Sequence, residues 1–145
     1  MMKKEYYTVE KEFKVEFYDV DSMNIVYHGN YVKFMEVGRC ALLDEIGYNY
    51  NEMREENFSF PVVDIKVRYL KSLHFNEDAK ICSPIPQHEN CLKVKYEIFN
   101  AKGELCTKAE STQMCVNEYT GESMLTCPEN FVRKVNEAIA LKNQG

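Results

Sequence analysis

Residues 29–46 read GNYVKFMEVGRCALLDEI, and this stretch decides the fold of the chain. Its apolar side chains recur at helical spacing and cover most of the circumference of the helix, rather than one stripe. They are Tyr31, Val32, Phe34, Met35, Val37, Ala41, Leu42, Leu43 and Ile46. A helix that is apolar on so many sides is covered by other elements. Gly47 follows it at the position of a C-terminal cap.

Five further segments alternate apolar and polar side chains, which is typical of strands with one buried face. They are residues 9–17, 63–69, 78–85, 92–98 and 105–116. The third contains Pro84 and is followed by Pro86, and proline is tolerated in a sheet only at an edge or at the end of a strand. The turn 100–103 joins the last two segments as a hairpin.

The order of these elements indicates the fold class. A polar connector covers 51–57, either as a loop or as one helical turn, and an amphipathic helix over 129–142 follows Pro128. Successive strands joined by turns form an antiparallel sheet, and the long apolar helix is what the sheet covers. We therefore predict an α+β protein with an antiparallel five-stranded sheet wrapped around one long buried helix and a short C-terminal helix. This architecture is called the hot-dog fold.

Length and charge exclude several classes of protein. The 145 residues suit a single domain, 1–145. A net charge of -5 disfavours nucleic acid as a partner, because that affinity comes mainly from basic groups. No apolar run approaches the roughly 18 residues of a membrane span, and no signal peptide is recognisable, so we expect a cytoplasmic protein.

The six cysteines do not predict disulfides or a cysteine nucleophile. None lies in a Cys-x-x-Cys pair, and none has a histidine at a diagnostic spacing. A chain that buries a core of this size needs no disulfide framework. We expect reduced, mostly buried thiols.

The segment before the long helix, FYDVDSMNIVYHGNY at 17–31, holds two carboxylates and an imidazole. Free amides at a helix start carry partial positive charge and can polarise a carbonyl, while a nearby carboxylate attacks it or activates water. A thioester suits such a site because its carbonyl is more electrophilic than that of an amide. The alternative is purely structural, since Asp, Ser and Asn also form turns.

We predict neither a metal nor a cofactor. Two groups of side chains could be considered as metal ligands, but neither has the spacing of a recognised site. These groups are Asp19, Asp21 and His28, and His74, Glu77, Asp78 and His88.

The string YDVDSMNIVYHGNYVKFMEVGR at 18–39 resembles the signature of the 4-hydroxybenzoyl-CoA thioesterase family of hot-dog proteins, especially its acyl-CoA thioesterases of the YbgC type. That signature has the form aromatic-x-Asp-x-Asp-x-x-Gly-hydrophobic-Val-Tyr-His-x-x-Tyr, followed by an aromatic-rich helix with Glu and Arg. The later segment VVDIKVRYLKSLHF at 62–75 resembles the second strand of the family.

The resemblance implies roles for individual residues. Asp21 matches the catalytic carboxylate, which acts as nucleophile or general base. His28 matches a histidine that lies near the thioester and helps to position substrate or water. The backbone amides of Tyr27, His28 and Gly29 would polarise the thioester carbonyl.

Four other residues match the family in supporting positions or depart from it. Asp19 matches the first Asp and is expected to support the loop. Asn24 stands where the family usually has Gly, and asparagine tolerates a positive φ better than most residues. Glu36 and Arg39 match the Glu and Arg of the helix, and their spacing also suits a simple i,i+3 ion pair.

By resemblance, the chain is a cytoplasmic enzyme of acyl-CoA and fatty acid metabolism that hydrolyses acyl-CoA thioesters without a cofactor. Two alternatives stay open: a thioesterase for acyl-ACP, and a non-catalytic acyl-CoA or acyl-carrier binding protein. The resemblance also implies a homo-oligomer. Two sheets would join edge to edge in a dimer, dimers would pair into a homotetramer, and the substrate would lie at the seam between subunits.

Overall fold

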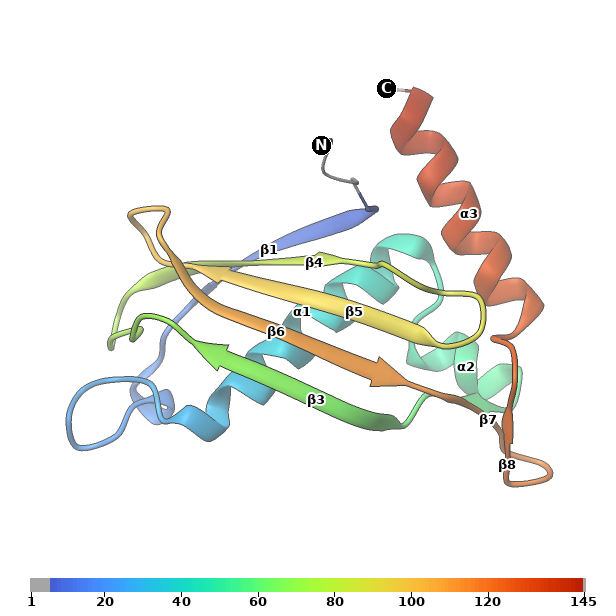
Figure 1. Ribbon diagram of the computed structural model, residues 1–145, viewed down its shortest axis with the longest axis horizontal. Helices are drawn as coiled ribbons and strands as arrows, with labels where there is room; N and C mark the ends of the chain where they lie inside the picture. The colour runs from blue at the N-terminus through green and yellow to red at the C-terminus, as the bar shows by residue number, and fades with distance from the viewer. Residues whose placement is uncertain (1–5, 145) are drawn as a thin grey trace.

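In the computed structural model, which describes residues 6–144, a long helix lies across one face of a five-stranded antiparallel sheet (Figure 1). The helix is α1, Tyr31–Ile46. In their spatial order the strands are β1 (Thr8–Lys14), β4 (Asp78–Pro84), β5 (Leu92–Phe99), β6 (Leu105–Gln113) and β3 (Val62–Tyr69). The predicted α+β architecture, with its sheet around one long helix, is confirmed.

Smaller elements lie at the far end of α1 from the loop that precedes it (Figure 1). A short helix, α2 (Tyr50–Glu55), forms in the predicted polar connector, where one helical turn was among the expectations. A second sheet contains β2 (Phe58–Ser59), β7 (Cys115–Asn117) and β8 (Glu122–Met124). The C-terminal helix is α3, Glu129–Gln144.

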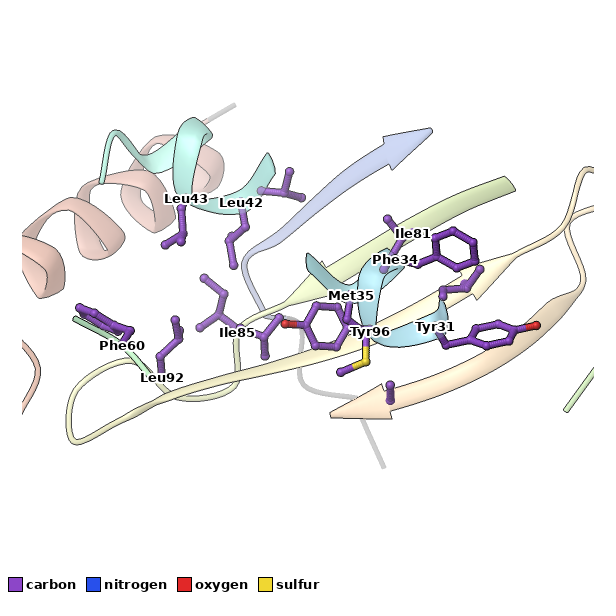
Figure 2. Packing of buried hydrophobic residues seen from close by; sticks show 14 of the residues in the cluster. Tyr31, Phe34, Met35, Leu42, Leu43, Phe60, Ile81, Ile85, Leu92 and Tyr96 are labelled. Atoms are coloured by element: carbon purple, nitrogen blue, oxygen red, sulfur yellow. The ribbon is translucent and has the colours of Figure 1, made fainter. Parts of the chain in front are cut away.

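The core forms where α1 packs over β1, β4 and β5. Figure 2 shows the side chains of Phe34, Met35 and Leu42 among the buried cluster. Phe34 stacks on Phe13 of β1 with ring centroids 4.6 Å apart. Gly38 faces β4 so closely that an added Cβ would lie 2.5 Å from Ser83 Oγ. Glycine at this position therefore allows α1 to lie closer to β4 than a residue with a Cβ would.

Several local predictions are confirmed. Gly47 ends α1 in the left-handed conformation, with φ of 77°. Pro84 is the last residue of β4, a terminal position. All six cysteines are free, and four of them are buried. No described helix is long and apolar enough to cross a membrane.

Two predicted strands are longer than the observed ones. The strand predicted over 9–17 ends at Lys14, and Phe17 instead begins the 3-10 turn η1 (Phe17–Asp19) with its side chain exposed. The reason is that the Glu16 N–H donates to Asp19 Oδ2, which turns the chain out of the sheet.

The strand predicted over 105–116 divides at Met114, where β6 ends and β7 begins in the second sheet. Here the Gln113 side-chain amide donates to the carbonyl of Phe60, and the Met114 N–H donates to the carbonyl of Pro61. These contacts direct the chain away from β5. The alternation of residues 105–116 gives no sign of this second sheet.

The third difference concerns β3, whose apolar side chains are more exposed than their alternation suggests. Ile65 pairs with Ser111 and Tyr69 with Thr107, so both point to the same sheet side as these buried β6 residues. Ile65 is nevertheless 38% exposed and Tyr69 is 50% exposed. The strand pairs with β6 on one side only, so its other edge is free in the described protomer.

We predict that Gly38→Ala destabilises the protein by about 1–3 kcal/mol, because overpacking against Ser83 outweighs the roughly 1 kcal/mol that alanine gains in a helix. Urea unfolding measures the change. Cys40→Ala, at an exposed position of the same helix, is the control. A Gly38→Ala protein more stable than wild type would contradict the close packing.

Candidate active site

The loop between η1 and α1 is a short antiparallel ladder that carries Asp21 at its tip. Val20 and Val26 form a bridge, and the Asp21 N–H donates to the carbonyl of Ile25 at 2.9 Å. The Asn24 N–H donates back to the Asp21 carbonyl at 3.0 Å. Asn24 has a φ of 65°, the left-handed conformation that glycine would adopt most easily. Asparagine therefore keeps the turn at the position where the signature has glycine.

The Asp21 carboxylate is exposed and only partly engaged. Its Oδ1 accepts the N–H of Met23 at 2.8 Å, in an Asx turn that fixes the side chain. Its Oδ2 accepts no hydrogen bond from residues 6–144. One carboxylate oxygen is therefore free to attack an electrophile or to accept a proton from water.

Asp19 has the opposite environment, because its side chain is only 2% exposed. Oδ1 forms an ion pair with Lys33 of α1, and Oδ2 accepts the N–H of Glu16 at 2.9 Å. The Asp19 carbonyl accepts the Tyr27 N–H at 3.0 Å and the Asn30 side-chain amide at 2.8 Å. Asp19 thus joins three segments of the loop and has no free oxygen for chemistry.

The amides at the start of the helix differ in availability. A 3-10 turn, η2 (His28–Asn30), leads directly into α1. The N–H groups of His28 and Gly29 have no acceptor in the described part of the chain, as expected for the first turn of a helix. The Tyr27 N–H is occupied by the Asp19 carbonyl. The expectation that Tyr27 contributes a free amide is therefore wrong, and two candidate amides remain.

Two ring side chains, Tyr27 and His28, lie at this helix start. The rings of Tyr27 and His28 lie 4.3 Å apart, and the His28 side chain is exposed. A Cβ on Gly29 would lie 2.8 Å from Cε1 of Tyr27. Glycine at this position therefore leaves room for the Tyr27 ring.

Tyr69, at the end of β3, also reaches this region, which the sequence analysis did not foresee. Its hydroxyl donates to the carbonyl of His28 at 2.9 Å, and its ring meets that of Tyr31 edge-on at 5.1 Å. The two bonded residues are 41 positions apart, so no local pattern indicates the contact.

Glu36 and Arg39 form the i,i+3 ion pair that their spacing allows. Arg39 also lies near Tyr96, whose hydroxyl shares a hydrogen bond of 3.0 Å with Ser111 Oγ. Burial raises the pKa of Tyr96, an effect that the Arg39 guanidinium opposes. These contacts give Glu36 and Arg39 a structural role in the packing between α1 and the sheet.

No group of three or more described His, Cys, Asp or Glu side chains could hold a metal ion. A cavity of about 750 Å³ does lie on the sheet face opposite α1. Its charged lining residues are Lys66, Arg68, Lys95, Lys108, Lys142, Glu97 and Glu110. Because it is on the other face of the sheet, this cavity does not include the Asp21 loop.

Comparison with known proteins identifies the family of the chain. The model of the thioesterase-like superfamily matches residues 15–135. The putative acyl-CoA thioesterase YneP of Bacillus subtilis is 41% identical over 110 residues, covering 75% of this chain and 80% of that protein. The acyl-CoA thioester hydrolase YbgC of Escherichia coli O157:H7 is 27% identical over 105 residues, covering 72% and 78%.

A solved structure matches nearly the whole chain. A DHNA-CoA thioesterase from Staphylococcus aureus has a TM-score of 0.81 and 30% identity, with 95% of each chain covered. The match covers nearly all of this chain, so it confirms the hot-dog fold.

We predict that Asn24→Gly changes the free energy of unfolding by less than about 0.5 kcal/mol, whereas Asn24→Val lowers it by roughly 1–2 kcal/mol, because a β-branched side chain is strained at positive φ. Thermal unfolding with far-UV circular dichroism measures both changes. Ser22→Val, at an exposed position in the same loop, serves as control. Equal stability of the two valine variants would contradict the strain at Asn24.

Proposed function

Since this chain belongs to the thioesterase-like superfamily, we propose that it is an enzyme that hydrolyses acyl-CoA thioesters to the free acid and coenzyme A. The relatives named acyl-CoA thioesterases and the DHNA-CoA thioesterase structure support this activity. The six free thiols suit a cytoplasmic location, where cysteines stay reduced.

The observation that carries this proposal is that Asp21, whose Oδ2 accepts no hydrogen bond from the described residues, lies on the short ladder that leads into the free amides of the helix start. Asp19 bonds to Tyr27 and Asp21 bonds to Ile25 in one ladder, so the two rungs lie roughly 6–7 Å apart at the rise of a strand. In the reaction, the attacking oxygen lies about 3 Å from the carbonyl carbon, and the N–H donor lies about 3 Å from the carbonyl oxygen. The attacking oxygen and the donor are therefore separated by a similar distance. We propose that one substrate carbonyl contacts both the Asp21 carboxylate and the amide of His28 or Gly29.

Two routes use the same atoms. In the first, a free oxygen of Asp21 forms a bond to the carbonyl carbon, the C–S bond breaks, and coenzyme A leaves as a thiolate that takes a proton from solvent. Water then hydrolyses the acyl-aspartyl anhydride. In the second, Asp21 accepts a proton from water as the water oxygen attacks the carbonyl carbon directly; the C–S bond then breaks, and the coenzyme A thiolate takes the proton that Asp21 holds.

The helix start supplies the remaining contribution in either route. Negative charge develops on the carbonyl oxygen as the new bond forms, and the N–H groups of His28 and Gly29 would donate to it. The partial positive charge at the N-terminus of α1 favours the same charge. The exposed His28 imidazole would position the substrate or the attacking water.

We further propose that the protein is a homo-oligomer whose dimer forms through β3. A free strand edge pairs readily with another copy, and here the edge strand also exposes apolar side chains. Val63 is 58% exposed and Ile65 38% exposed. Pairing of two β3 strands would cover these side chains and place the substrate at the seam. Two such dimers would form the tetramer.

Replacing Ile65 with lysine tests this assembly. We predict that Ile65→Lys shifts the protein from dimer or tetramer toward monomer, because a charge on the edge strand opposes pairing. Light scattering coupled to size-exclusion chromatography measures the mass. Leu125→Lys adds the same charge at a position that is 89% exposed and outside both sheets, and should leave the mass unchanged. A wild-type monomer would contradict the proposed dimer.

The activity itself is tested with Asp21→Asn. We predict at least a ~100-fold loss of turnover, as removal of a positioned base or nucleophile causes, with an unchanged fold. Asparagine keeps the Oδ1 acceptor for Met23, so the loop geometry should persist. A thiol-reactive dye measures coenzyme A release from acyl-CoA of several chain lengths and from aromatic acyl-CoA. The control is Asp44→Asn, at an exposed carboxylate of α1.

Each result of this assay has a defined meaning. Wild-type turnover by the Asp21→Asn protein would contradict the role of Asp21. Saturable acyl-CoA binding without thiol release would favour a non-catalytic binding protein. Release only from acyl-ACP would make the carrier protein, rather than free coenzyme A, the substrate carrier.

A further inference from the structure

We propose that Tyr69 is a positioning residue for this reaction, whose hydroxyl orients the Gly29 N–H toward the oxygen of the bound thioester. The proposal rests on the acyl-CoA hydrolysis proposed above. It concerns a residue on β3, far in sequence from the loop and helix start that hold the other site residues.

The carbonyl of His28 accepts two hydrogen bonds. The His28 carbonyl accepts the Tyr69 hydroxyl at 2.9 Å and also accepts the N–H of Tyr31. A carbonyl oxygen has two lone pairs, so both are used. The two donors come from different elements, β3 and α1, and together they fix the direction in which this carbonyl points.

The geometry of the peptide bond connects this carbonyl to the next N–H. The carbonyl of His28 and the N–H of Gly29 belong to one planar trans peptide, so they point in opposite directions in the same plane. A contact that fixes the carbonyl therefore fixes the N–H. Hydrogen bonds to the carbonyl also polarise the peptide, which makes its N–H a stronger donor. The Gly29 N–H has no acceptor among the described residues and is available to a ligand.

Tyr69 is itself held in place. The Tyr69 backbone pairs with Thr107 of β6, and the following N–H groups of Leu70 and Lys71 both donate to the carbonyl of Cys106, at 2.8 and 3.0 Å. Its ring packs against Tyr31, which is only 3% exposed. The hydroxyl is thus held by the main-chain pairing of β3 and by the packing of its ring.

The exposure of Tyr69 separates this role from a contribution to the core. The Tyr69 side chain is 50% exposed, so it is not part of the core. If its hydroxyl is removed, the His28 carbonyl still accepts the N–H of Tyr31, so no buried group loses its only partner. A variant that removes only the hydroxyl should therefore fold normally. Any effect on the reaction then reports on the orientation of the peptide.

The test compares Tyr69→Phe with Tyr119→Phe. Tyr119 lies between β7 and β8, at the other end of α1, and its hydroxyl accepts a hydrogen bond of 2.7 Å from the Asn57 side chain (Figure 1). Each variant removes one hydroxyl and keeps the ring. We expect kcat of Tyr69→Phe to fall about 10-fold, less than the roughly 100-fold or more that follows loss of a direct oxyanion donor. KM and the melting temperature should stay near wild-type values, and Tyr119→Phe should change neither kinetic constant.

A measurement on the peptide itself accompanies the kinetics. In 15N-labelled protein, the amide proton resonance of Gly29 should move upfield in Tyr69→Phe and stay in place in Tyr119→Phe, because the peptide loses polarisation only in the first. A merely structural role of Tyr69 would lower the melting temperature without this specific shift.

The outcomes distinguish the two proposals. An active wild type with an equally active Tyr69→Phe protein, or an unmoved Gly29 resonance, overturns the role of Tyr69 and leaves the proposed function intact. A change in KM alone also overturns it, because Tyr69 would then contact the substrate. A wild type that releases no thiol from any thioester overturns both.

Discussion

The buried carboxylate of Asp19 is the contact on which the site depends. A charge taken out of water is costly unless it is paired and hydrogen-bonded, and Asp19 has both an ion pair with Lys33 and the N–H of Glu16. The carboxylate thereby ends β1, and the ion pair ties the loop to α1. The Asp19 carbonyl then occupies the Tyr27 N–H. The ladder that displays Asp21 and leaves the next two amides free follows from these contacts.

Much of the fold could be predicted because its main features are local patterns. The wide apolar surface of residues 29–46 indicates a covered helix, and alternation indicates each strand of the main sheet. Gly47 has the positive φ of a helix cap, and Asn24 has the positive φ expected where the family carries glycine. The errors lie where a side chain far from the pattern intervenes. Alternation continues through Phe17 although the Asp19 carboxylate turns the chain, and it continues past Met114 although Gln113 bonds to the Phe60 carbonyl.

The candidate site divides in the same way. Asp21 and His28 could be proposed from a motif, because both lie within one short segment. The amide of Tyr27 was wrongly included, because its acceptor is a main-chain carbonyl that no sequence motif specifies. Tyr69 was missed because its contact with His28 exists only once β3 lies beside the helix start. Likewise, the alternation of β3 predicted a buried face, but no described element covers its free edge.

The position of Tyr69 has a thermodynamic consequence. Tyr69 belongs to the edge strand β3 and also donates a hydrogen bond to the first turn of the helix. This one hydroxyl therefore couples the conformation of the strand to the conformation of the helix start. Such coupling is reciprocal: a contact that orders β3 favours one orientation of the His28–Gly29 peptide, and a ligand held by that peptide favours the ordered strand by the same free energy. In the proposed dimer, the affinity for ligand and the affinity between subunits would therefore be coupled through this one hydrogen bond.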